Sequence, residues 1–149
     1  MLGKLNPEQM DYLLRSQVVG RIGCYAHGHV YLVPITYLYD GQQIYCHTIE
    51  GLKVQMMRQN PLICFEVDAI QTMVNWQSVI IQGRYEELSG EESQEARLLL
   101  LNRLTPFLIS ETSLPADTPQ IHQALKNSPH AQVTFRIKIL EKTGRYEKR

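Results

Sequence analysis

Residues that could bind a phosphate follow one another over a short stretch of this 149-residue chain. His47 and Thr48 end a strand-like run, and Gly51 and Lys53 open a short helical run. A strand-to-helix junction exposes free backbone amides, and together with a hydroxyl, an imidazole and an ammonium these amides suit an anionic group. The stretch therefore predicts a phosphate site at this junction, and the phosphate of a bound cofactor is its natural occupant.

Single residues of this stretch also fit purely structural roles. Lys53 taken alone is an ordinary surface lysine on a short helix, and His47 could simply pack at a strand end. The neighbouring Cys46 invites comparison with a zinc site, but zinc normally requires about four ligands and nothing nearby supplies the others. We therefore expect no metal site, and the joint presence of the polar groups favours phosphate.

Alternation and turn residues predict six strands around this junction. Asp40 and Gly41 are a strong hairpin signal, because both central residues of such a turn need positive φ. Asn60 and Pro61 end the short helix that Gly51 opens. The predicted strands cover residues 18–26, 29–39, 42–48, 62–69, 75–88 and 133–140.

Helices are predicted between and outside these strands. Asn6 can cap a first helix that begins at Pro7, with Gln9 reaching back to the cap. A second capping box, Ser89-Gly90-Glu91-Glu92, opens a later helix. The predicted helices cover residues 7–16, 52–59, 90–104 and 118–127, and a charged tail follows the last strand.

The order of these elements predicts the fold class. No helix separates the first three strands, so a parallel α/β arrangement fits poorly. We expect a mainly β (α+β) fold, a six-stranded antiparallel split β-barrel with peripheral helices. The length of 149 residues predicts one domain, 1–149.

Charge and cysteine usage limit the expected partners. The chain has 15 basic and 15 acidic residues, a balance that argues against binding to nucleic acid and opposes self-association little. Its 3 cysteines include no CxxC pair, which favours reduced thiols in a cytoplasmic protein. Lys4, Asn6 and Glu8 interrupt the apolar start, and no apolar run approaches a membrane span, so we expect neither a signal peptide nor a membrane segment.

Two further residues raise the possibility of a ligand beside the strands. Pro34 lies within a predicted strand, and since proline cannot donate to the ladder it marks an edge, a bulge or a ligand contact. Trp76, the only tryptophan, could anchor a dimer interface, fill the core or stack on a ligand. The residues alone leave these alternatives open.

Several short motifs occur in the order seen in one known superfamily. They are Val19-Gly20-Arg21-Ile22-Gly23, Val33-Pro34-Ile35-Thr36-Tyr37, Asp40-Gly41, Tyr45-Cys46-His47-Thr48, Gly51-Leu52-Lys53, Asn60-Pro61, Asn75-Trp76-Gln77-Ser78-Val79, Gly83-Arg84, Phe135-Arg136-Ile137 and Thr143-Gly144-Arg145. Through them the chain resembles the pyridoxamine 5′-phosphate oxidase-like FMN-binding split-barrel superfamily, and within it the branch of the nitroimidazole-resistance proteins. The resemblance runs from Leu13 to Arg145.

This resemblance implies FMN as the cofactor and a homodimer with two flavins at the subunit interface. Residues 34–36 would line the isoalloxazine ring, partly through backbone groups, and the strand-to-helix junction would hold the phosphate. Trp76 and Ser78 would approach the flavin from the same or the other subunit. The implied cofactor-binding residues are Pro34, Ile35, Thr36, His47, Thr48, Gly51, Lys53, Trp76 and Ser78.

The C-terminal residues depart from the pyridoxamine phosphate oxidases themselves. Residues 141–145 read Glu-Lys-Thr-Gly-Arg and lack the arginine-rich motif that holds the substrate phosphate in those enzymes. Oxidation of pyridoxamine phosphate is therefore not expected.

The resemblance predicts an FMN-dependent oxidoreductase acting on a small molecule such as a nitro compound, a quinone or a pyridoxal-like substrate. No residue stands out as catalytic. One alternative is a non-catalytic protein that binds or senses flavin, haem or deazaflavin. Another is an interaction protein whose flavin site has decayed. Possible axial ligands to haem are His27, His29, His47, His122 and His130.

Overall fold

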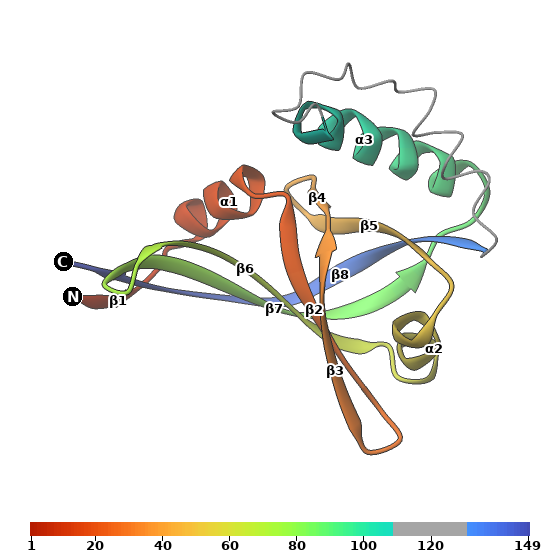
Figure 1. Cartoon of the computed structure of the whole chain (residues 1–149), viewed down its shortest axis with the longest axis horizontal. Coiled ribbons are helices and arrows are strands. Elements are labelled where there is room, and N and C mark those ends of the chain that lie inside the picture. Colours follow the sequence, from red (N-terminus) through yellow and green to blue (C-terminus); the bar gives the residue numbers. More distant parts are fainter. Residues whose placement is uncertain (109–130) are drawn as a thin grey trace.

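The computed structural model describes residues 1–108 and 131–149, and within them an antiparallel sheet carries three helices (Figure 1). The helices are α1 (Pro7–Ser16), α2 (Leu52–Gln59) and α3 (Gly90–Leu108). The strands are β1 (Leu2–Lys4), β2 (Val19–Ala26), β3 (His29–Thr36), β4 (Leu38–Tyr39), β5 (Gln43–Ile49), β6 (Leu62–Thr72), β7 (Asn75–Glu87) and β8 (Gln132–Lys148). The helix predicted at residues 118–127 lies outside the described residues.

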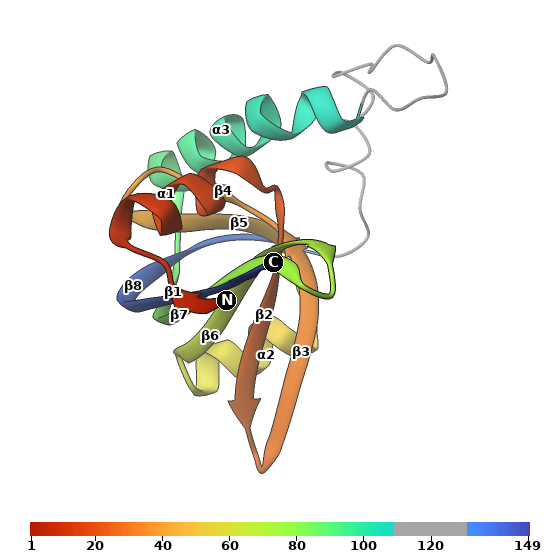
Figure 2. The same ribbon diagram turned by 90° about the vertical axis from the view of Figure 1, so that its left-hand side faces the viewer.

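Hydrogen bonding orders the strands β3-β2-β6-β7-β8-β5-β4, with β1 paired to β8, and all these pairs are antiparallel. The sheet curves strongly but does not close, because β3 and β4 are its two ends (Figures 1 and 2). The predicted split barrel is therefore confirmed. The short strands β1 and β4 add to the six strands that were predicted.

Several predicted boundaries differ from the structure, since β6 extends to Thr72 and α3 to Leu108, and two differences are larger. The run 29–39 forms two strands because the chain changes partner at Tyr37: residues up to Thr36 pair with β2, whereas Leu38 and Tyr39 pair with β5. The Tyr37 hydroxyl donates to the Leu14 carbonyl at 2.7 Å. The expected charged tail instead continues β8 to Lys148, between β7 and β1. Backbone groups form a ladder whatever the charge of the side chains, and the 13-residue β7 offers them a partner along its length.

The turn at Asp40 and Gly41 differs from the predicted geometry. Gly41 has a φ of +98°, but Asp40 keeps a negative φ and its carboxylate instead accepts hydrogen bonds from the amides of residues 42–43, at 2.8 and 2.7 Å. The β2–β3 turn has positive φ at both central residues, +51° at His27 and +77° at Gly28. The turn with two residues of positive φ therefore joins β2 to β3, and this hairpin projects from the rest of the sheet (Figure 2).

Alternate residues of the strands build one core inside the curved sheet. Helix α1 adds Met10, Leu13 and Leu14 to this core, and the predicted capping box at Asn6 and Gln9 is confirmed. The largest fully buried side chains include Tyr37, Phe65, Phe135, Leu13, Leu14, Ile22 and Ile44.

Within the described ranges no helix has both the length and the hydropathy needed to cross a membrane.

Candidate functional site

The outer face of the sheet carries four of the predicted site residues. Register pairs Pro34 on β3 with Arg21 on β2, and Ser78 on β7 with Asp68 on β6. Side chains alternate between the two faces of a strand, so Ile35 points inward, where it is 8% exposed. The residues on the outer face are Pro34, Thr36, Trp76 and Ser78.

These four residues do not all lie close together. Strands β2 and β6 separate β3 from β7. Trp76 is near the start of β7, at the end of the sheet where both termini lie, while the β5–α2 junction lies at the opposite end (Figure 1). Within one chain, therefore, Trp76 is not brought to the predicted phosphate site.

Ser78 belongs to a charged cluster on this face that the sequence did not single out. Its hydroxyl donates to Glu66 at 3.0 Å, and the Arg21 guanidinium lies 3.7 Å from Glu66 and 3.2 Å from Asp68. Burial, and then the neighbouring Asp68, raise the pKa of Glu66. The available signal was the alternation of acidic and apolar residues along β6, where Glu66 and Asp68 follow Phe65 and Val67.

The β5–α2 junction brings together three of the four residues predicted to hold a phosphate. Thr48 is on the face of β5 that also carries the buried Cys46, and α2 begins four residues later. Gly51 is the N-cap of α2 and has no side chain to cap it, so the first amides of the helix have no side-chain acceptor from this position. Lys53 follows in the first turn, and within the described residues it forms no ion pair with a carboxylate.

The Lys53 ammonium lies near two strands that are far apart in the sheet order. Burial raises the pKa of the thiols of Cys24 on β2 and Cys46 on β5, and in both cases the positive charge of Lys53 opposes that rise. Strand β3 is next to β2 and has no second partner among the described strands. Lys53 therefore stands between β2 and β5, on the side where the two ends of the sheet leave the split barrel open.

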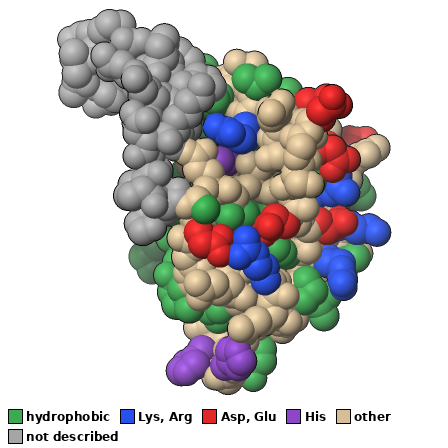
Figure 3. Space-filling model, turned by 90° about the vertical axis from the view of Figure 1, so that its right-hand side faces the viewer, with side chains coloured by type: hydrophobic (Ala, Val, Ile, Leu, Met, Phe, Trp, Pro, Cys, Tyr) green, Lys and Arg blue, Asp and Glu red, His purple; other side chains and the backbone are tan. Residues whose placement is uncertain are grey.

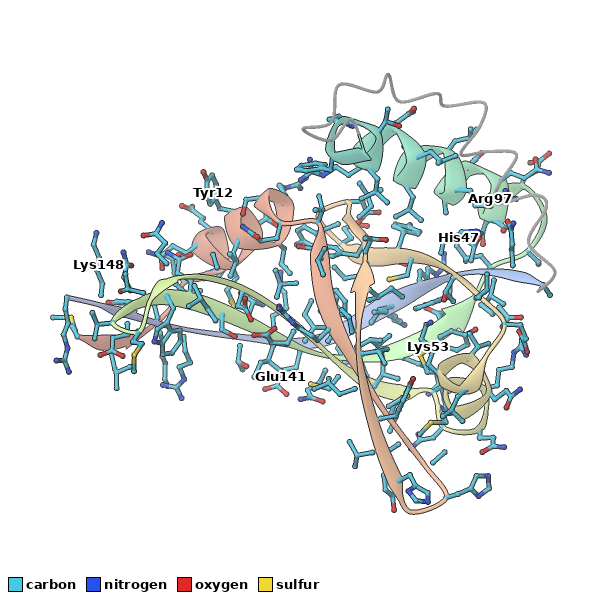
Figure 4. The ribbon with its side chains drawn as sticks, in the orientation of Figure 1. Tyr12, His47, Lys53, Arg97, Glu141 and Lys148 are labelled. Carbon is cyan, nitrogen blue, oxygen red and sulfur yellow. The ribbon has the colours of Figure 1, made fainter. Side chains whose placement is uncertain are left out.

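His47 lies on the opposite face of β5 from Thr48. In Figure 4 it lies toward α3, whereas Lys53 lies toward α2. Its Nδ1 is 2.8 Å from the Thr134 hydroxyl, and its buried Nε2 has no hydrogen-bond partner in the described part of the chain. Burial, and then the charge of Arg97, lower the pKa of His47. Consecutive residues of a strand point to opposite faces, so the sequence analysis overlooked this separation when it grouped His47 with Thr48.

An arginine in the last turn of α2 also reaches this junction. Arg58 Nε is 2.9 Å from Glu87 Oε1, and Arg58 Nη1 pairs with Glu50, the residue before Gly51. The Tyr85 hydroxyl donates to the same Glu87 oxygen at 2.6 Å. Sequence reasoning missed this network because Glu87 lies 29 residues after Arg58.

An open groove of about 690 Å³ lies on the outer face of the sheet, where the β2–β3 hairpin leaves it. Its lining is mostly apolar, and several of its side chains are well exposed, with Val30 at 78% and Leu32 at 67%. Hydrophobic side chains also gather toward that end of the molecule in Figure 3. Other apolar residues of the groove are Tyr25, Leu62 and Leu140.

Sequence comparison relates the chain to one family along nearly its whole length. The family model for pyridoxamine 5′-phosphate oxidase matches residues 6–145. An uncharacterized protein of Rhizobium meliloti is 31% identical over 88 residues, which are 59% of this chain and 58% of the relative. That match thus spans less than two thirds of the relative's length.

Solved structures share the fold over the whole chain. A FAD-binding protein from Mesorhizobium loti is 27% identical, with a TM-score of 0.78 over 100% of this chain and 98% of its own. A candidate 5-nitroimidazole antibiotic resistance protein from Bacteroides thetaiotaomicron has a TM-score of 0.71 at 14% identity, over 98% of this chain and 87% of its own. A FAD and heme binding protein from Mycobacterium smegmatis has a TM-score of 0.72 at 13% identity, over 99% and 74%. From the family match along residues 6–145 and this shared fold, we conclude that the chain belongs to the pyridoxamine 5′-phosphate oxidase family of split barrels.

Proposed function

We propose that the protein binds a flavin nucleotide, FMN or FAD, with a phosphate at the β5–α2 junction. The observation that carries this proposal is the position of Lys53 and the uncapped start of α2 at the open seam of the barrel. Amides and an ammonium are the groups that bind phosphate at a helix N-terminus. The FAD-binding protein of Mesorhizobium loti, 27% identical over the full chain, supports the choice of a flavin.

The side chains at this junction fit the different parts of a flavin. Thr48, Gly51 and Lys53 would bind the phosphate next to the ribityl chain, which FMN and FAD share. The exposed backbone edge of residues 34–36 would contact the isoalloxazine ring. His47 faces away from Lys53, so its part in phosphate binding is the least supported of the four.

We further propose that two copies of the chain form the complete site. Trp76 is near the start of β7, at the opposite end of the sheet from the β5–α2 junction, and Ser78 follows it on the same strand, so in this proposal a second copy supplies them. The apolar groove on the outer face, with Leu32 67% exposed and Val30 78% exposed, favours burial against such a copy. The net charge of zero adds no long-range repulsion.

The reaction proposed is the reduction or oxidation of a small molecule, such as a nitro compound, a quinone or a pyridoxal-like substrate. When bound, the flavin supplies hydride and electron transfer. The protein would orient the cofactor through its phosphate, exclude water with the apolar side chains of the interface, and leave one ring face open to the substrate. The tail at residues 141–145 lacks an arginine cluster that would select a phosphorylated substrate.

Flavin titration tests the proposed binding site. The wild-type protein should bind FMN or FAD with quenching of flavin fluorescence. Lys53→Ala should weaken that affinity roughly tenfold, the equivalent of one hydrogen bond to a charged group. Lys138→Ala, at an exposed lysine of β8 outside this junction, is a matched control and should change affinity less than about twofold. No flavin uptake by the wild-type protein, or equal effects of the two variants, would refute the site.

The oligomer and the activity need separate measurements. Light scattering at micromolar protein should give twice the chain mass of 17.2 kDa, and a monomer would contradict the shared site. The flavin-loaded, chemically reduced protein should be reoxidised by at least one member of a panel of nitro compounds, quinones and pyridoxal vitamers under anaerobic conditions. Failure with the whole panel would favour a non-catalytic flavin-binding role.

A further inference from the structure

The guanidinium of Arg58 connects three parts of the fold at the β5–α2 junction. Arg58 is in the last turn of α2, yet it reaches back to Glu50, the residue before the N-cap Gly51. Its Nε also lies 2.9 Å from Glu87 Oε1 at the end of β7. One side chain thus links the end of the helix, the turn that opens it, and a long central strand.

This link is fixed from the core outward. The Tyr85 side chain is 6% exposed, and its ring packs on Phe135 with 4.9 Å between ring centroids. The Tyr85 hydroxyl donates to Glu87 at 2.6 Å, which holds the carboxylate that Arg58 contacts. A guanidinium presents its donors in a rigid plane, so the position of Glu87 fixes the position that Glu50 can take.

A second contact fixes the same turn from β8. The Glu50 amide donates to the Ala131 carbonyl at 2.7 Å. The backbone of Glu50 is therefore held by Ala131, the residue that precedes β8, and its side chain is held by Arg58 of α2. Since Gly51 follows directly, the direction in which the first amides of α2 point depends on these two contacts.

Charge gives Arg58 a second effect on this turn. The carboxylate of Glu50 stands next to the amides proposed to bind phosphate, and an unpaired carboxylate would repel a phosphate dianion there. Arg58 neutralises it through the ion pair. Arg58, first by its hydrogen bond, and then the Tyr85 hydroxyl also lower the pKa of Glu87, so the second carboxylate of the network stays ionised at neutral pH.

We propose that Arg58 is a positioning residue for the phosphate of the bound ligand: it pins the Glu50–Gly51 turn to Glu87 and cancels the charge of Glu50. This inference rests on the proposed flavin site and adds a residue that does not itself touch the phosphate.

The test compares FMN with riboflavin, which has the same ring and no phosphate. Arg58→Gln should weaken FMN binding roughly tenfold and leave riboflavin binding within about twofold. A variant that was merely less stable would lose both ligands alike. Arg15→Gln is the matched control, because Arg15 is also an exposed helical arginine in an ion pair, 3.0 Å from Asp11 on α1, and it should change neither affinity.

A double variant separates the charge effect from the positioning effect. Glu50→Gln/Arg58→Gln removes the repelling carboxylate together with its partner, so it should bind FMN about threefold or more tighter than Arg58→Gln alone. In the flavin-free protein, hydrogen exchange at the amides of residues 50–54 should be faster in Arg58→Gln than in wild type.

The possible results are distinct. Three results would overturn the role of Arg58: wild-type affinity for FMN in Arg58→Gln, equal losses of FMN and riboflavin affinity, or unchanged hydrogen exchange at residues 50–54. The flavin site itself would still stand if Lys53→Ala weakens FMN binding. A wild-type protein that binds no flavin would overturn both.

Discussion

Removal of one buried hydroxyl should measurably destabilise the protein. Tyr37 lies between β3 and β4 with none of its side chain exposed, and its hydroxyl donates to the Leu14 carbonyl at 2.7 Å. Leu14 is in the last turn of α1, where carbonyls have no partner within the helix. Burial raises the pKa of Tyr37, so the hydroxyl remains a donor at neutral pH. Tyr37→Phe removes this donor and little else.

The size of the effect follows from what the substitution leaves behind. The ring remains, with its edge-to-face contact to Phe65 at 5.2 Å between centroids. The Leu14 carbonyl, on a residue with 0% exposure, loses its partner, and an unsatisfied buried polar group costs about 1–3 kcal/mol. We therefore expect the free energy of unfolding to fall by about 2 kcal/mol, which for a chain of this size lowers Tm by about 4–8 °C.

Urea unfolding followed by circular dichroism and by tryptophan fluorescence measures this change. Tyr12→Phe is the control, because Tyr12 on the same helix is 74% exposed and its loss of a hydroxyl should cost less than about 0.5 kcal/mol. Equal free energies of unfolding for the two variants would refute the reasoning, since the Leu14 carbonyl would then be satisfied without Tyr37.

Three further predictions concern packing and pH. Gly20→Ala should lower the free energy of unfolding measured in urea by about 1–3 kcal/mol, because a Cβ there would overlap the buried Phe65 ring. Gly23→Ala on the same strand is the control: its new Cβ would lie 3.5 Å from the nearest neighbouring atom, so this substitution should be tolerated. The lowered pKa of His47 means that folding favours its neutral form, so the stability of the protein should fall as pH drops below about 6.5. Between about pH 7.5 and about pH 5.5 the Tm of His47→Asn should therefore fall less than that of wild type, and equal falls would contradict this. The raised pKa of Glu66 means that its ionised form costs folding free energy above that pKa, so Glu66→Gln should raise Tm relative to wild type more at about pH 7 than at about pH 4, as scanning calorimetry at the two pH values would reveal.

Local signals determined much of the secondary structure. The capping box at Asn6, the helix over Leu52–Gln59 and the hairpin at residues 40–41 depend on neighbours within a few residues, and the structure contains all three. Thr48, Gly51 and Lys53 at the β5–α2 junction were predictable as a group for the same reason. A phosphate site built from one strand end and one helix start needs no long-range information to be recognised.

The boundaries of two strands depended on distant partners. The sequence ended the last strand at residue 140, but pairing with β7 and β1 carries β8 on to Lys148. It predicted one strand over residues 29–39, but the chain changes its partner from β2 to β5 at Tyr37. In each case the strand boundary depends on hydrogen bonds between residues far apart in the sequence, whereas strand propensity reflects only neighbouring residues.

Sequence alone therefore determined which residues form the stretch proposed to bind a phosphate, because a junction of a strand and a helix is built by consecutive residues. Tertiary structure decided what each face of β5 meets, since His47 lies toward α3 whereas Lys53 lies toward α2. It also decided what holds the junction in place: Arg58 meets Glu87 across 29 residues only because β7 ends beside α2. Local backbone preferences act over a few residues, whereas the curvature of the sheet brings distant residues together.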